Sequence, residues 1–547
     1  MPKLDKEEIK RLAGRPPLKT ILFLIIGPLL SQLTGAFYGI LNQIWISKKL
    51  GEKGMAAVAI EITLENIGRA FGYFMMIAGS TQISSLFGKN LASEASQVVC
   101  DILRCTIICG IIVPAILLPT HKPMCKWFGA SDDTAQLGYR YLSPLCYGSV
   151  VTCLSLACQG FLQAEGRTLL IGAVDICALL IGCLALTPIF LYVFHMNVES
   201  AGISTIIVDG CSALIFLTMY FRGKFGIKPQ FNQFLKPFSK HTWQSLVVGS
   251  SQLIANLAAS VPGIPIRNLI GQSTEPGKAY DLAMDGFNVL CRFYLLVNAV
   301  LNANCTAFIA PASYAYARQN YRRFLKLSLH SAWIGFAWCA FMNIFSFGLP
   351  RQIAKLFGDG EEYLNIAEGM VRNCYALGSM AFFRFNAQAM LQAMQKGTSS
   401  MIVSMSCQLL SNLLFAYILF YTDKHNVVRL MWLYSWSHLF GVVIGTIFLI
   451  YPLWQVYQKA KIQTISENEE ISDDTDITQQ SEDNDSFQKS VETKQKDDEK
   501  PNDDEKANDH EQFSDNEHSS DNDQSSDNEK SSGDNDNDNE AKRLKEI

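Results

Sequence analysis

Long runs of apolar residues, separated by short polar and charged segments, dominate most of the chain. A helix needs ~20 residues to cross the ~30 Å hydrocarbon core of a bilayer. Twelve runs reach that length, and the charged residues within 55–80 and 280–310 make these two the weakest. We therefore predict an all-α polytopic membrane protein with twelve transmembrane helices. The predicted spans cover residues 20–46, 55–80, 98–119, 135–160, 168–194, 199–221, 243–270, 280–310, 325–349, 363–393, 398–421 and 428–454.

Uncharged polar residues interrupt the first of these runs. Residues 27–51 are apolar enough to lie in lipid, yet they contain Gln32, Tyr38 and Asn42. Lipid offers such side chains no hydrogen-bond partner, so they usually face other helices or a water-filled cavity. We expect this helix to lie inside the bundle.

Short motifs of the first half recur in the same order in the second half. The sequence offset is 220 for the opening stretch and near 229 for the later motifs. A nearly constant offset indicates two parallel repeats of six spans, a known transporter arrangement with the substrate site between the halves. The matches are SQL at 31–33 and 251–253, FGASDD at 128–133 with FGDGEE at 357–362, and FLQAEGRT at 161–168 with MLQAMQKGT at 390–398.

Charge is distributed unevenly along the chain. Residues 461–547 contain 29 acidic and 10 basic residues, and the remainder contains 22 acidic and 36 basic residues. The acidic tail has too few large apolar residues to offset the entropy of ordering, so we predict that it is disordered. The expected organisation is an N-lobe over 1–225 (spans 1–6), a C-lobe over 226–460 (spans 7–12) and the tail.

Basic residues in the short connections predict the orientation in the membrane. With the N-terminus inside, the inner segments hold 20 Lys and Arg and the outer segments hold 10. This bias and the even span count predict a multi-pass protein with both termini in the cytoplasm. No small-residue cleavage site follows the N-terminal basic residues, so we expect a retained first span rather than a cleaved signal.

Sequence signals for catalysis, metal binding and ATP hydrolysis are lacking. All 15 cysteines lie before the tail, mostly in apolar runs, without a CxxC pair or a Cys/His zinc spacing, and we interpret them as buried apolar residues. The nearest Walker A candidate, Gly88-Lys89, is followed by Asn90 and lacks the upstream glycine. We expect no enzyme activity, no metal site, no cofactor and no nucleic-acid partner. Uphill transport would then require an ion gradient.

Several of these motifs resemble those of the MATE family, the multidrug and toxic compound extrusion transporters. FYGILNQIWISKKLG at 37–51 is similar to the family's first-span pattern, and LQAEGRT and LQAMQKGT to its repeated inner-loop motif. SAGISTIIVDG at 200–210 resembles its sixth-span pattern. The resemblance extends over residues 15–455. It implies a V-shaped pair of six-helix bundles that exports organic solutes in exchange for Na⁺ or H⁺.

The resemblance also marks positions where this chain departs from the family. Asn42 stands where the family has an acid in the first span, close to Tyr38. Alignment on Pro188 places Cys183 and Thr187 at the family's fifth-span Asn and Asp. The sixth-span threonine is retained as Thr205. Asn42 either forms an interhelical hydrogen bond or lines the cavity.

Other intramembrane carboxylates are candidates for coupling. Glu61 and Glu65 are four residues apart on one helix face, with Arg69 one turn further. They form either a charged stripe towards the cavity or a self-neutralised ladder. Asp175 and Asp209 lie in apolar runs, where an unpaired carboxylate costs ~3 kcal/mol. Each has either a coupling or substrate role, or a structural one through pairing with Arg or protonation.

Three charged residues of the second half complete the candidate set. Asp285 and Arg292 echo Glu61 and Arg69 and favour a structural pair. Arg384 is an isolated cation that would attract an anionic group of a substrate.

The leading hypothesis is a secondary transporter that functions as a monomer in the bilayer. It exports small organic, cationic and amphipathic solutes by H⁺ or Na⁺ antiport with alternating access. The loss of the family's N-lobe carboxylates favours H⁺. The alternatives are a lipid or lipid-linked flippase of the same fold and a membrane-embedded receptor or enzyme.

Overall fold

The described part of the chain is helical. It contains helices, turns and bends and no strand, which confirms the predicted all-α class. The chain divides into two units, 1–468 and 469–547, and all candidate membrane spans belong to the first. The computed structural model describes residues 10–127, 132–275, 277–356, 358 and 360–497.

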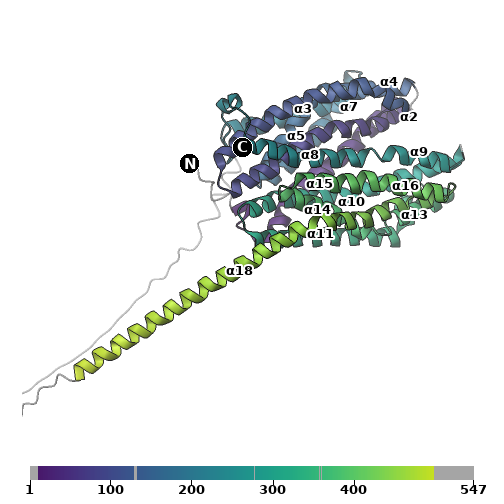
Figure 1. Ribbon diagram of the computed structural model, residues 1–547. Coiled ribbons are helices and arrows are strands. Elements are labelled where there is room, and N and C mark those ends of the chain that lie inside the picture. The colour runs from purple at the N-terminus through teal and green to yellow at the C-terminus, as the bar shows by residue number, and fades with distance from the viewer. Residues whose placement is uncertain (1–9, 128–131, 276, 357, 359, 498–547) are drawn as a thin grey trace, which may run out of the picture. The chain divides into compact units, whose positions relative to one another are not determined.

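The helices of the first unit run side by side (Figure 1). Those of the first half are α2 (Pro17–Gly88), α3 (Ala92–Trp127), α4 (Asp132–Tyr147), α5 (Ser149–Ala164), α6 (Thr168–Leu179), the π-helical segments η1 (Leu180–Leu186) and η2 (Ile189–Val193), and α7 (Glu199–Phe221). After the 3₁₀ turn η3 (Phe231–Leu235), the second half has α8 (Lys240–Ser260), α9 (Gly263–Ser273), α10 (Lys278–Ala317), α11 (Tyr321–Gly348), α12 (Pro350–Lys355), α13 (Glu361–Cys374), η4 (Gly378–Met380), α14 (Ala381–Ala393), α15 (Gly397–Ser404), the π-helical η5 (Met405–Leu410), α16 (Ser411–Thr422), α17 (Val427–Leu430) and α18 (Trp432–Asp497).

The described residues form nine helices that are long and apolar enough to cross a membrane, or ten if α4 and α5, which meet at 55°, form one broken span. The protein is therefore a multi-pass membrane protein. Two of the twelve predicted spans do not qualify. Residues 55–80 carry charged side chains, and residues 363–393 are divided among α13, η4 and α14.

Helix α2 has 72 residues, and a straight helix of that length would extend ~108 Å. Both ends of α2 nevertheless contact residues around the turn between α10 and α11. Near its start, Thr20 accepts a hydrogen bond from Arg323 Nη2 at 3.2 Å. At its end, a Cβ on Gly88 would lie 2.5 Å from the carbonyl oxygen of Tyr314. The helix therefore reverses direction and contributes two antiparallel limbs, which contain predicted spans 20–46 and 55–80.

The turns that join helices at one end of the bundle repeat between the halves. Asn90 and Gln319 have φ values of 59° and 63°, and Gly166 and Gln395 have values of 71° and 60°. The two members of each pair are separated by the same sequence offset as the later repeated motifs. In all four turns the next residue's N–H donates to the carbonyl five positions before it, at 2.8–2.9 Å. This geometry is typical of the Schellman termination of a helix.

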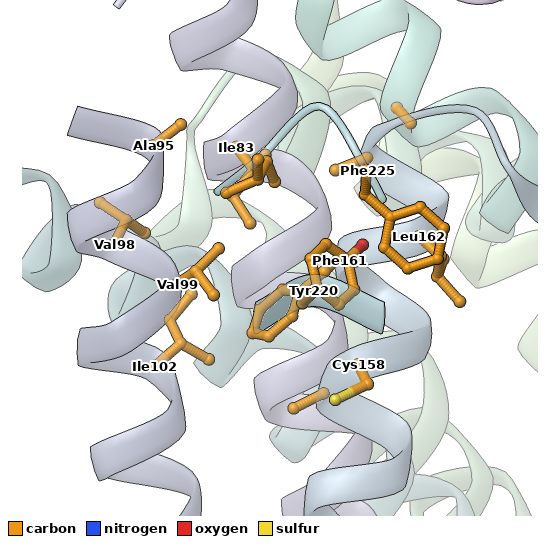
Figure 2. Close-up of a cluster of buried hydrophobic side chains, with 14 of the residues drawn as sticks. Ile83, Ala95, Val98, Val99, Ile102, Cys158, Phe161, Leu162, Tyr220 and Phe225 are labelled. Atoms are coloured by element: carbon orange, nitrogen blue, oxygen red, sulfur yellow. The ribbon is translucent and has the colours of Figure 1, made fainter. Parts of the chain in front are cut away.

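Apolar cores stabilise each half and also the contact between the halves. Figure 2 shows part of the first, where Phe161 of α5 packs edge-on against Tyr220 of α7 with ring centroids 5.9 Å apart. The ring centroid of Phe225, which follows α7, lies 4.6 Å from that of Tyr220. A second core is built from helices α9 to α18. Helix α2 packs against α8 and α10 and so joins the halves.

Two buried carboxylates hold the connection between the halves. Asp101 of α3 accepts hydrogen bonds from Ser239 N at 2.8 Å and Thr242 Oγ1 at 2.7 Å. Glu165 accepts one from Ile227 N at 3.1 Å. Both acids are 0% exposed. They satisfy backbone and side-chain donors that would otherwise be buried without partners.

The predicted disorder from residue 461 differs from the structure, in which α18 continues to Asp497. This segment is rich in Glu, Gln, Lys and Asp, and the first three of these have favourable helix propensity. Residues 498–547 lie outside the described part of the chain.

Candidate functional site

Asn42, Cys183 and Thr187 form one buried polar group. Asn42 of α2 is 5% exposed, and its Oδ1 accepts hydrogen bonds from Thr187 Oγ1 at 3.1 Å and Cys183 Sγ at 3.4 Å. Thr187 Oγ1 also lies 2.7 Å from Ser204 Oγ of α7. Cys183 is in the π-helical segment η1, and such segments recur at functional positions in helices.

Tyr38 and Thr205 extend this group by one helical turn. The Tyr38 hydroxyl lies 3.3 Å from Ser204 Oγ and accepts a hydrogen bond from Thr205 Oγ1 at 3.2 Å. Ser204 was not predicted, although its position beside Thr205 in a small-residue stretch was a usable signal. The neutral cluster consists of Tyr38, Asn42, Cys183, Thr187, Ser204 and Thr205.

The neutral cluster contains no charged group. Cys183 and Thr187, which donate to Asn42 Oδ1, belong to other helical segments than Asn42, so Asn42 makes interhelical hydrogen bonds. This geometry agrees with the structural interpretation of Asn42. A net-neutral, mutually hydrogen-bonded group has little attraction for a monovalent cation.

A charged cluster lies further along the same lobe. Arg69 pairs with Glu65 at 3.7 Å, and Glu65 Oε2 accepts a hydrogen bond from Tyr141 OH at 2.8 Å. Asp209 of α7 accepts one from Thr152 Oγ1 at 2.7 Å. Arg69 also attracts Asp209. The helices α2, α4, α5 and α7 thus each contribute to one network.

Asp175 of α6 belongs to the same electrostatic group. It accepts a hydrogen bond from Gln159 Nε2 at 3.2 Å, and it interacts electrostatically with both Asp209 and Arg69. We define the charged cluster as Glu65, Arg69, Asp175 and Asp209. It contains three carboxylates and one guanidinium.

A small cavity borders the charged cluster. Its volume is about 30 Å³, and Glu65, Arg69 and Thr152 contribute to its walls among mainly apolar side chains. A cavity needs roughly 10–15 Å³ to hold one water molecule. The cavity therefore has room for water or a small cation beside the carboxylates.

Glu61 does not share this environment, although it is one turn from Glu65. It is 1% exposed, and its Oε1 lies 2.8 Å from His121 Nε2 of α3. The predicted stripe of Glu61, Glu65 and Arg69 is thus divided. Glu65 pairs with Arg69 as in the ladder interpretation, whereas Glu61 faces another helix.

Asp285 and Arg292 are both exposed on α10. Seven residues correspond to ~10 Å of rise along a helix. Asp285 lies within electrostatic range of Tyr363. The pair therefore does not reproduce the buried environment of Glu61.

Arg384 of α14 lies in an aromatic environment in the second half. It is 8% exposed and donates to Tyr294 OH at 3.0 Å. Its guanidinium lies 4.1 Å from the ring centroid of Phe385, and His438 stacks on Tyr294 at 6.5 Å. Among the described residues, Arg384 has no carboxylate within ion-pair distance. Sequence reasoning identified Arg384 but not Tyr294 or His438.

Comparison with known families places much of the sequence in one of them. The MatE family model matches residues 29–187 and 277–418, which is more than half of the chain. The multidrug export protein MepA of Staphylococcus aureus strain N315 is 20% identical over 403 residues, covering 73% of this chain and 87% of that protein. MepA of strain bovine RF122 / ET3-1 is 23% identical over 219 residues, covering 40% of this chain and only about half, 48%, of that relative.

Solved structures share the fold. A MATE crystal structure in complex with MaL6 aligns with a TM-score of 0.76 at 18% identity, covering 83% of this chain and all of that one. A MOP-superfamily transporter from Pyrococcus furiosus, described as having a binding pocket of reversed polarity that suggests a different function, aligns with a TM-score of 0.75 at 19% identity. That alignment covers 84% of this chain and 99% of the other.

Proposed function

Because the chain belongs to the MatE family of multidrug and toxic compound extrusion transporters, we propose that it exports organic, cationic and amphipathic compounds by cation antiport with alternating access. The family consists of transporters and not of enzymes. The observation that carries the proposal is the charged cluster, in which three carboxylates share the guanidinium of Arg69.

Excess negative charge in a membrane interior is costly unless a cation neutralises it. In the charged cluster, Arg69 can compensate one carboxylate and leaves the other two to bind a proton, a sodium ion or an organic cation. Antiport follows if the coupling cation and the organic cation compete for this charge. Each ligand then shifts the conformational equilibrium only by its differential affinity for the two states.

We favour H⁺ over Na⁺ as the coupling ion. Sodium is usually held by several oxygen ligands around one point, whereas a proton needs one carboxylate. The carboxylates of Asp175 and Asp209 are bound to different partners, Gln159 and Thr152.

The proposed architecture has twelve spans in two lobes, 1–225 and 226–460, with both termini in the cytoplasm and the acidic tail at 461–547. The equivalent left-handed turns at Asn90 and Gln319 support the internal repeat. We propose that one copy of the chain in a bilayer is the functional unit, with small organic solutes as its partners and no bound cofactor.

Reconstituted vesicles test this function. With ethidium as the probe cation, an imposed inward proton gradient should drive dye efflux from the protein's inner side, and Asp209→Asn and Asp175→Asn should reduce that efflux. Asp285→Asn is the matched control, since it removes the same charge from an exposed site on α10. Absence of flux with either a H⁺ or a Na⁺ gradient, over a broad panel of organic cations, would contradict the proposal.

A lipid or lipid-linked flippase is the second candidate. Buried Arg384, bonded to Tyr294 rather than to a carboxylate, suits the anionic headgroup of such a substrate. The same vesicles, loaded with a fluorescent anionic phospholipid on one leaflet, separate the two functions. Lipid transfer that depends on Arg384, without ethidium flux, would favour the flippase.

A further inference from the structure

Three potential metal ligands meet at the end of α3. His121 Nε2 lies 2.8 Å from Glu61 Oε1, Cys125 Sγ lies 3.3 Å from the same oxygen, and Cys125 Sγ lies 3.2 Å from His121 Nε2. The three side chains are 1–3% exposed or fully buried. A nitrogen, a sulfur and a carboxylate oxygen therefore face one point inside the protein.

Helix geometry explains why the ligands converge. His121 and Cys125 are four residues apart on α3, and such residues lie one above the other on the same face. Glu61 approaches this face from α2. The sequence contains the HxxxC spacing, but sequence reasoning overlooked it because the third ligand lies far earlier in the chain, on another helix.

The second oxygen of Glu61 indicates that the group needs a further partner. Glu61 Oε2 is buried and has no hydrogen-bond partner among the described residues. Leaving a charged, buried acceptor unsatisfied is unfavourable. Buried carboxylates are normally paired with a cation or coordinate a metal. The orphaned oxygen lies on the same carboxylate whose other oxygen faces the histidine and the thiol.

Helix α4 leaves room for this arrangement. A Cβ at position 138 of α4 would collide with Glu61 Oε1, so glycine there lets α4 pack against the carboxylate without displacing it. The next residue, Tyr139, packs its ring edge-on against His121 with centroids 5.4 Å apart. Contacts from α4 therefore close the site and fix the imidazole.

We propose that Glu61, His121 and Cys125 form a zinc-binding site. Zinc takes Cys, His and carboxylate ligands in tetrahedral geometry, and ligand pairs around it would be ~3.3–3.6 Å apart. The observed separations of 2.8–3.3 Å widen to these values with movements of a few tenths of an ångström. Three protein ligands leave the fourth position for water or for Glu61 Oε2.

The donor set distinguishes zinc from magnesium and calcium. Magnesium and calcium prefer oxygen ligands only, so the thiol and imidazole disfavour them. A bound zinc ion would join α2 directly to α3 beside α4. It would lie apart from Arg69 and Asp209, so this proposal does not depend on what the protein transports.

The competing interpretation is an ion pair between a protonated His121 and Glu61. That pair needs no thiol at position 125 and leaves Glu61 Oε2 without a partner. Metal binding, in contrast, requires a deprotonated Cys125 and releases its proton. Participation of the thiol therefore separates the two interpretations.

Cobalt titration of the purified full-length protein tests the proposal, because Co²⁺ substitutes for Zn²⁺ and has a visible thiolate-to-metal absorption. We expect one Co²⁺ per chain with tetrahedral d–d bands and a thiolate charge-transfer band, both removed by one equivalent of Zn²⁺. Wild-type protein without a thiolate band at saturating Co²⁺ would overturn the proposal, and this readout needs no variant.

Variants assign the band to the site. Cys125→Ser should abolish the charge-transfer band, and Glu61→Gln and His121→Gln should each weaken Zn²⁺ affinity by at least ~100-fold, since even the loss of partners that orient the ligands costs 10–100-fold. Cys109→Ser is the matched control, a buried cysteine on the same helix but outside the cluster. An unchanged band in Cys125→Ser protein that elutes as a monodisperse peak, or equal loss in Cys109→Ser, would overturn the assignment.

Discussion

Glu65 and Asp209 lie beside Arg69 in the first half, whereas the equivalent positions of the second half hold Tyr294 and His438, which lie beside Arg384. Equivalence here means the same sequence offset that relates the left-handed turns of the two halves. One half thus surrounds its arginine with carboxylates and the other with aromatic side chains. The offset relates these neighbours but not the two arginines, since Arg69 corresponds to Asn298 and Arg384 to Ser155.

The two halves also differ in which helix carries the glycine of a close helix contact. In the first half Gly27 of α2 packs against the backbone at Thr168, where any Cβ would collide. The corresponding positions of the second half are Val247 and Gly397, and there the glycine is on the opposite helix. Small residues let helix backbones approach closely in membranes. Each of these close contacts between two helices needs one glycine, which can lie on either helix.

These comparisons separate what the fold requires from what function requires. Turns and close helix contacts recur because both halves need the same backbone path. Among the described residues, the carboxylates of Glu65 and Asp209 do not recur at the equivalent positions, which hold Tyr294 and His438, so we propose that cation coupling resides in the first half. We propose that the second half, with a cationic and aromatic interior, recognises an anionic group where the transported molecule carries one.

The largest expected effect is on folding. Gly27→Val should prevent close packing of α2 against α6 and lower stability by about 3 kcal/mol or more, because the collision involves backbone atoms that cannot move aside. The measurement is the yield and Tm of the monodisperse protein. Adding Thr168→Gly reproduces the arrangement of the second half and should recover most of the loss.

Gly35→Val is the control for this pair, since a Cβ at position 35 of the same helix meets no atom within 4 Å. If Gly35→Val is as destabilising as Gly27→Val, the proposed reciprocal packing is wrong.

The next largest effect should be on coupling. Asp209→His places in the first half the residue found at the equivalent position of the second half, His438. It removes one of the three carboxylates around Arg69. Coupling free energies are typically 1–3 kcal/mol, so gradient-driven ethidium flux should fall by about 5- to 150-fold. His438→Asp, the reverse exchange, should leave the proton dependence of flux unchanged. Equal losses in both variants would contradict a division of roles.

Much of this arrangement was predictable from sequence. The lengths of the apolar runs located the candidate spans except 55–80 and 363–393. Constant offsets matched positions that form the same turns, and the family motifs grouped Asn42 with Cys183 and Thr187. Contacts that depend on helix rotation were not predictable. Glu61 and Glu65 share a helix face, yet one meets α3 and the other α4.

The side-chain contacts that were not predicted have a common physical cause. A sequence pattern gives the apolar face of a helix but not which polar group of another helix it meets. The proximity of Glu61 to His121 and of Tyr294 to Arg384 depends on tertiary packing. The two predicted spans that did not qualify have other causes. Charged residues lower the hydropathy of residues 55–80, although the second limb of α2 packs within the bundle. Residues 363–393 are divided among three short helical segments.

A smaller effect is expected in the second half. Arg384→Gln removes a charged donor to Tyr294. Hydrogen bonds to charged groups contribute about 1.5–3 kcal/mol, so binding of a substrate with an anionic group should weaken about tenfold or more. Binding of ethidium, which has no anionic group, should not weaken. Isothermal titration with matched anionic and cationic amphiphiles distinguishes these outcomes, and equal weakening of both would exclude the assigned role.

The smallest effect on transport should come from the neutral cluster. Thr187→Val removes the hydroxyl bonded to Asn42 and Ser204 and should lower stability by about 1–3 kcal/mol. Because the cluster has no charge, the dependence of flux on the proton gradient should not change. Thr187→Ser, which keeps the hydroxyl, should behave as wild type, and a lost pH dependence in Thr187→Val would assign coupling to this cluster instead.

Proton release on substrate binding tests most directly whether the carboxylates of the first half couple cation to substrate. The purified protein is mixed with ethidium in weakly buffered detergent solution, and the pH change is recorded. We predict that the wild type releases protons as ethidium binds and that the Asp175→Asn, Asp209→Asn double variant releases far fewer, whereas Asp285→Asn releases as many as the wild type. Equal release by the wild type and the double variant, or ethidium binding without release, would contradict the account.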